Sequence, residues 1–195
     1  MRLGTAWMVS LLAVGALLAP CTTARAQGGE FDVDPAACVI APIPMPLPGD
    51  TGDLATPSPT PTPVAVPQGD AADDDVAAAV SERIAMAIAC QNAGDPLRLL
   101  ANFTQRWVSE RFAGYDLVFY SRFQAAAEHP QPLPEGERIE LLSVDEVVVL
   151  SDYEVVATVT TRIGGDTQKS AIALVETFGE WLIDGGSIDP VTEKR

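Results

Sequence analysis

Four segments rich in β-branched residues follow one another in the C-terminal part of this chain, and only short connections separate them. The segments are 139–150, 153–163, 167–178 and 180–184. The connections are Ser151-Asp152, Gly164-Gly165-Asp166 and Gly179, residue types that favour tight turns. Connections this short can join only antiparallel neighbours, because a parallel pair needs a crossover of about a dozen residues or more. The sequence therefore predicts a four-stranded antiparallel meander.

The residues before the meander show helical periodicity instead. Apolar side chains recur at every fourth position from Val76 to Ile88. The acidic run 73–75 precedes them, which suits a helix N-terminus because the helix dipole favours negative charge there. Residues 92–94 end this helix, with Gly94 suited to the left-handed position after a helix. Asp95-Pro96 then supplies the N-cap and first residue of a second helix.

The second helix has no clear end in the sequence, since helical spacing of apolar residues can be followed as far as Gly114. A third helical stretch covers 115–128, and the proline-rich run 129–134 ends it. Three helices followed by four strands, without βαβ alternation, indicate an α+β domain. We place this domain at 73–190 and expect the helices to pack on the apolar face of the sheet.

The first 26 residues have the pattern of a signal peptide. Arg2 precedes the apolar stretch 6–19, which is too short to span a bilayer comfortably, and Ala24-Arg25-Ala26 fits the small-x-small cleavage rule. We predict cleavage after Ala26 and a secreted or otherwise extracytoplasmic protein. The alternatives are a lipoprotein anchored at Cys21, for which Pro20 is a poor preceding residue, and an uncleaved anchor.

Residues 27–72 are predicted to form a disordered Pro/Thr-rich segment, because proline recurs between Ala41 and Gly69 and little apolar surface can be buried there. We expect it to act as a linker, with a spacer or partner-ligand role as the alternative. Loss of Cys21 on cleavage would leave Cys38 and Cys90, and an even pair in an oxidising compartment predicts a disulfide. The alternative is a buried free thiol at Cys90 and an exposed Cys38.

Charge and composition exclude several classes of function. The formal net charge is −15, which disfavours binding to nucleic acid and docking on an anionic membrane, so we expect membrane association only if Cys21 is lipidated. The single histidine, His129, rules out a catalytic histidine pair, and we predict no metal site and no cofactor.

Two stretches resemble the nuclear-transport-factor-2-like superfamily, which includes the SnoaL-like and other cone-shaped domains. Residues 84–104 (IAMAIACQNAGDPLRLLANFT) are similar to its first two helices and the break between them, and 180–186 (EWLIDGG) to its last strand. The resemblance covers roughly 76–187. It implies a curved sheet and a pocket between its concave face and the helices. The small hairpin usual between helices two and three of the family is not visible, so 107–114 must replace it or be helical.

Candidates for lining that pocket are large aromatic side chains and one mid-strand carboxylate; the alternative, which we favour for Tyr115 and Tyr120, is that the aromatic side chains pack as part of the core. The set is Trp107, Phe112, Tyr115, Tyr120, Phe123, Glu176 and Trp181. Glu176 faces the pocket if it shares the inner face with Ile172 and Leu174; if Ala171, Ala173 and Val175 form that face, Glu176 is solvated.

We therefore expect a secreted, non-catalytic domain that binds a small apolar ligand or a protein through the cone pocket or the sheet face, and that can form a homodimer through the sheet. The alternative is a pocket enzyme of isomerase, cyclase or dehydratase type that uses a buried carboxylate. A third possibility is a purely structural envelope protein without a cavity.

The leader and the cysteines generate one direct prediction. Native mass spectrometry of protein secreted by its own host should give a mature chain that begins at Gln27 and is two hydrogens lighter than its reduced form. A mass that begins at Cys21 and includes acyl chains would contradict the predicted cleavage site and show a lipoprotein instead.

Overall fold

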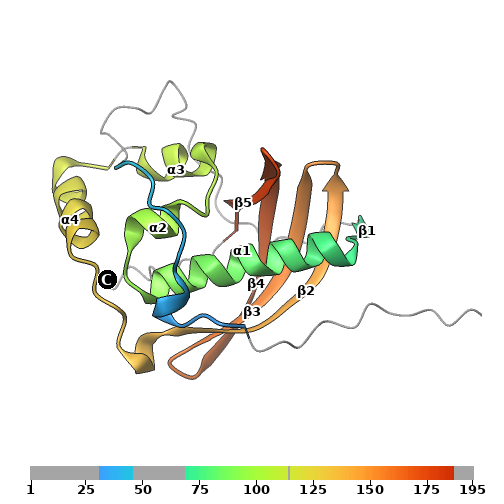
Figure 1. Cartoon of the computed structure of the whole chain (residues 1–195), viewed down its shortest axis with the longest axis horizontal. Helices are drawn as coiled ribbons and strands as arrows, with labels where there is room; N and C mark the ends of the chain where they lie inside the picture. Colours follow the sequence, from blue (N-terminus) through green and yellow to red (C-terminus); the bar gives the residue numbers. More distant parts are fainter. Residues whose placement is uncertain (1–30, 46–68, 114, 187–195) are drawn as a thin grey trace, which may run out of the picture.

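A computed structural model describes residues 31–45, 69–113 and 115–186 (Figure 1). The predicted leader, Cys21 and most of the proline-rich segment lie outside these residues. Within them, no helix combines the length and apolar character needed to cross a membrane.

Among the described residues the sheet has five strands in the order β1-β2-β3-β4-β5, and all neighbours are antiparallel. The predicted meander is present as β2 (Ile139–Ser151), β3 (Glu154–Ile163), β4 (Asp166–Thr177) and β5 (Glu180–Gly185). The additional strand β1 (Asp70–Ala71) pairs with Val148 and Val149 of β2. Sequence periodicity could not reveal β1, because a two-residue strand has no period.

In the part of the chain that the structure describes, four α-helices precede the meander instead of the three predicted. They are α1 (Asp74–Asn92), α2 (Pro96–Leu100), α3 (Gln105–Phe112) and α4 (Leu117–Glu128). Short 3-10 turns, η1 (Pro35–Ala37) and η2 (Glu135–Glu137), precede α1 and follow α4. Residues 107–112, which had to be helical or replace a hairpin, belong to α3.

The interruption between α2 and α3 has a specific cause at the edge of the sheet. The amide of Thr104 donates to the carbonyl of Ile183 at 2.9 Å, and the amide of Ile183 donates to the carbonyl of Asn102 at 2.9 Å. The chain leaves the helical conformation to pair with β5. The Thr104 hydroxyl then accepts a hydrogen bond from the Trp107 amide and caps α3.

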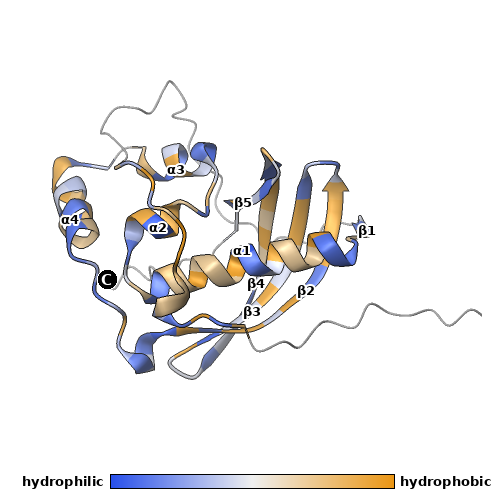
Figure 2. Ribbon diagram, viewed as in Figure 1, coloured by the Kyte–Doolittle hydropathy of each residue, from blue (hydrophilic) through white to orange (hydrophobic). Residues whose placement is uncertain are grey.

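The core lies between α1 and the concave face of the sheet. Figure 1 shows α1 crossing the strands, with α2, α3 and α4 grouped beyond its C-terminal half, and Figure 2 shows apolar residues along α1 and the strands behind it. The α1 side chains Val80, Ile84 and Ile88 are fully buried in one cluster with the inward residues of four strands. These strand residues are Ile139, Leu141, Val144, Val155, Ala157, Val159, Ile172, Leu174 and Ile183.

Residues 31–45, here called the N-terminal strap, are folded onto this body, which corrects the prediction that all of 27–72 is disordered. Phe31, Val33 and Ile43 pack against the core, and the Ile43 amide donates to the carbonyl of Leu97. The strap follows the C-terminal part of α1 and passes α2 (Figure 1). The apolar residues of the strap pack against residues that are distant in sequence, and the local composition of 27–72 cannot predict such contacts.

The side chain of Asn92 joins three parts of the fold. Its Nδ2 donates to the carbonyls of Val33 in the strap, at 2.8 Å, and Ile139 in β2, at 2.9 Å. Its Oδ1 accepts from the amide of Ile139 at 2.9 Å. The residue is buried, so all of these groups are shielded from water.

We predict that Asn92→Leu lowers the free energy of unfolding by about 3 kcal/mol or more, because it leaves three backbone polar groups without this partner at about 1–3 kcal/mol each. Urea denaturation measures the loss. Gln91→Leu is the matched control, since the Gln91 side chain is half-buried on the same helix. Equal stability of the two variants would show that the Asn92 network contributes little.

Candidate functional site

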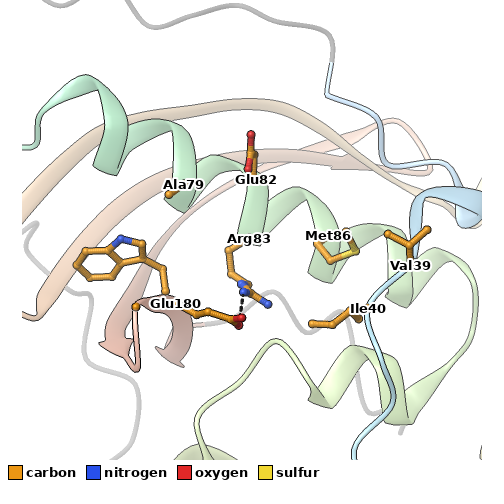
Figure 3. A pocket seen from close by; sticks show the side chains of 9 residues that line it. Val39, Ile40, Ala79, Glu82, Arg83, Met86 and Glu180 are labelled. Carbon is orange, nitrogen blue, oxygen red and sulfur yellow. Dashed lines mark hydrogen bonds and ion pairs between the residues drawn. The ribbon is translucent and has the colours of Figure 1, made fainter.

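A groove with a volume of about 400 Å³ opens between three segments of the chain (Figure 3). Its walls come from the strap, from one flank of α1, and from the turn that leads into β5. The lining residues are Val39 and Ile40; Ala79, Glu82, Arg83 and Met86; and Gly179, Glu180 and Trp181. We call this site the groove.

Helical geometry places the α1 residues on one flank. Ala79, Glu82, Arg83 and Met86 are three or four positions apart, so they lie side by side next to the buried stripe of the same helix. Figure 3 shows Met86, Val39 and Ile40 at one end of the groove and Ala79 toward the other, with Arg83 and Glu180 between them. Trp181, which follows Glu180 in the chain, also lines the groove. The site thus has apolar ends and a charged centre.

The charged centre is an ion pair with one covered and one exposed partner. A guanidinium nitrogen of Arg83 lies 3.0 Å from Glu180 Oε2, and the side chains are 15% and 66% exposed respectively. The other terminal nitrogen of Arg83 lies 3.4 Å from Oδ1 of the buried Asn102. Asn102 in turn donates through Nδ2 to the carbonyls of Arg98 and Leu99. Arg83 is therefore fixed, and Glu180 presents its charge to solvent.

The turn beside the groove holds an exposed aromatic residue in an unfavourable backbone conformation. Phe178 and Gly179 join β4 to β5 with φ values of 54° and 83°, the positive values of a type I′ turn. Glycine adopts this conformation freely, but a side-chain-bearing residue does so at a cost of about 1 kcal/mol or more. The Phe178 side chain is fully exposed, so no packing within the described residues offsets the cost.

The strap wall is held by the predicted cysteine pair. Cys38 and Cys90 form a disulfide with 4.7 Å between their Cα atoms, and both residues are buried. A guanidinium nitrogen of Arg98 donates to the carbonyl of Cys38 at 2.9 Å. Val39 and Ile40 follow Cys38 directly, so the disulfide sets their position against α1.

The aromatic residues predicted to line a pocket belong mainly to the core. Trp107 stacks on Phe103 with ring centroids 4.2 Å apart, and the Phe112 and Phe123 rings meet edge to face at 5.1 Å. Tyr120 is buried in the same core cluster. Tyr115 stacks on Phe119 at the surface. Of the predicted set, Trp181 alone lines the groove.

Glu176 shares the inner face with Ile172 and Leu174, both of which are buried, so the alternative register is wrong. Across the strand pair its Cα partner is Trp181. Glu176 lies near the end of β4, where its side chain is half-buried and its backbone amide donates to the carbonyl of Tyr153 at 2.8 Å. Within the described residues, no hydrogen bond joins the Glu176 carboxylate to a tyrosine side chain. The carboxylate–tyrosine pair that an isomerase-type site would need is therefore not formed there.

The groove was missed in the sequence for two reasons. Val39 and Ile40 fell in a segment predicted to be disordered, and no motif marks the contact between α1 and the β4–β5 turn. One signal was present: the polar residues Ser81-Glu82-Arg83 interrupt the apolar sequence of α1. Arg83 directly precedes the buried stripe residue Ile84, and an arginine at such a position needs a local partner.

Other charged groups lie elsewhere. The pKa of Arg106 is raised by its hydrogen bond with Asp184, and the pKa of the exposed Arg162 is raised by its hydrogen bond with Glu140; neither arginine lines the groove. The part of the chain that the structure describes contains no group of three His, Cys, Asp or Glu side chains arranged to hold a metal ion.

Comparison with known proteins provides little information about the function of this chain. No protein-family profile and no curated protein matches the chain. Among solved structures it is similar to an "Ntf2 like protein involved in plasmid conjugation", with 13% sequence identity and a TM-score of 0.39. The similarity covers 68% of this chain, which spans about half (47%) of the length of that chain. A likeness of this size carries no functional argument.

The disulfide gives a prediction for the strap wall. Replacing both cysteines, Cys38→Ser with Cys90→Ser, should lower the free energy of unfolding by about 4 kcal/mol on the chain-entropy account. Urea denaturation measures this loss, and amide exchange at Ile43, which bonds to Leu97, should become faster. A reductant should destabilise the wild-type chain but not the double variant. An unchanged unfolding midpoint in the variant would show that packing alone holds the strap.

Proposed function

We propose that this chain is an extracytoplasmic binding domain without a catalytic role, and that its binding site is the groove rather than the interior of the cone. The observation that supports this most directly is the groove itself. Its volume of about 400 Å³ falls in the range of ligand sites, about 300–1,000 Å³. Three separate segments build its walls, so its shape depends on the folded state.

The interior of the cone is a poorer candidate. Side chains of α1 and of the sheet meet there in one buried cluster, and Phe112 and Tyr120 pack into it from the helices. Apolar packing of this kind contributes to stability, and the aromatic rings already contact one another instead of lining a space for a ligand.

The non-catalytic role rests on the groups available at the groove. Its carboxylates, Glu82 and Glu180, are exposed, and its arginine is already paired. No observation within the described residues favours the isomerase, cyclase or dehydratase alternative.

The extracytoplasmic location is supported by two independent features. The N-terminal 26 residues have the pattern of a cleaved leader. The folded domain contains the Cys38–Cys90 disulfide, and such bonds persist mainly in oxidising compartments.

The binding site can be tested by filling it. We expect small molecules and short peptides that bind the ¹⁵N-labelled chain to shift the amide signals of Ile40, Ala79 and Gly179 in a fragment screen by NMR. Ala79→Trp should abolish these shifts, because an indole at this exposed position occupies the groove. Ala78→Trp is the matched control, since Ala78 is exposed on α1 but does not line the groove. Hits that shift only signals around Phe112 would place the site elsewhere.

A further inference from the structure

The accessible charges of the groove are negative. Glu180 is 66% exposed, whereas Arg83 beneath it is 15% exposed and already bound to Glu180 and Asn102. Glu82 is exposed on the other side, and among the described residues no hydrogen bond or ion pair engages its side chain. The whole chain carries a net charge of −15.

These charges determine whether the groove favours a positively or a negatively charged ligand. An anion would have to displace Glu180 from Arg83 and then lie beside two carboxylates. A cation meets those carboxylates without breaking the ion pair, and the field of the whole chain attracts it. The groove is therefore complementary to a positively charged group.

Exposed apolar surface lies at both ends of the groove. Val39, which lines the strap end, is 73% exposed, and the fully exposed Phe178 precedes the lining residue Gly179. A small molecule held at the centre of the groove would leave these two side chains in water. A longer occupant could cover them together with Trp181, and aromatic residues of this kind commonly dominate protein–protein contacts.

Building on the proposed binding role, we propose that the groove docks an extended segment of a partner protein in which a basic side chain lies between apolar ones. The basic side chain lies against Glu180 at the centre, on the side of the groove that faces away from Arg83, and Glu82 adds negative charge from the α1 wall. Apolar side chains on either side contact Trp181 and Phe178 at one end and Met86 and Val39 at the other. The strained turn is retained because it projects Phe178 toward the partner.

The test is selection of peptides from a displayed random heptapeptide library on the full secreted chain with its disulfide intact. We expect the selected peptides to be enriched in Lys or Arg flanked by apolar residues. Glu82→Gln combined with Glu180→Gln should weaken their binding about tenfold. Glu135→Gln combined with Glu137→Gln removes the same charge from exposed positions in η2 and should change binding less than about twofold.

Two further variants separate docking from folding. Glu82→Gln alone leaves the Arg83–Glu180 pair intact and should still weaken binding. Phe178→Gly relieves the positive φ, so we expect it to raise the thermal unfolding midpoint while it lowers peptide affinity. A residue with only a structural role would not move these two quantities in opposite directions.

The possible outcomes distinguish this inference from the proposed function. Acidic or uncharged peptides that lose binding with Ala79→Trp would overturn the basic partner but leave the groove as the site. Basic peptides that both glutamine pairs weaken equally would show general attraction to an acidic chain and overturn the inference. If no peptide depends on the groove, the inference fails, and the fragment screen alone decides the proposed function.

Discussion

The side-chain amide of Asn92 is the interaction on which the arrangement of this fold most depends. It satisfies backbone groups of the strap and of the start of β2 from the last turn of α1. In addition, the carbonyl of Asn92 accepts from the amide of Leu133, in the connection to β2. One buried residue thus sets where the helical layer ends, where the sheet begins and where the strap lies. The Cys38–Cys90 bond, two residues earlier on α1, holds the same region covalently.

The parts of the fold that local pattern controls were predictable. The strand meander follows from turn residues at 151–152, 164–166 and 179, and α1 from a four-residue apolar repeat with an acidic cap. The break at 101–104 was not predictable, because the same residues have helical spacing and leave the helix only to bond with Ile183. The strap and β1 were missed for the same reason, since their partners lie far along the chain.

The candidate site was less predictable than the fold. A resemblance directed attention to the cone interior, where aromatic residues such as Phe112 and Tyr120 pack together as a core. The groove instead lies between three segments that are distant in sequence. Its charged residues indicate which ligand it favours only when the solvent exposure of each side chain is known. Arg83 and Glu180 would cancel in any count of charge, yet one is covered and the other faces water.

Both ends of the segment 46–68 are attached to the same folded body. The strap precedes it and is bonded to α1 and α2, and β1 follows it and pairs with β2. The proline-rich stretch is therefore flanked on both sides by residues of the same folded body, which begins before this stretch rather than after it. A protease that cuts it would leave two polypeptides linked through Cys38 and Cys90, which would migrate as one species on a non-reducing gel and as two after reduction.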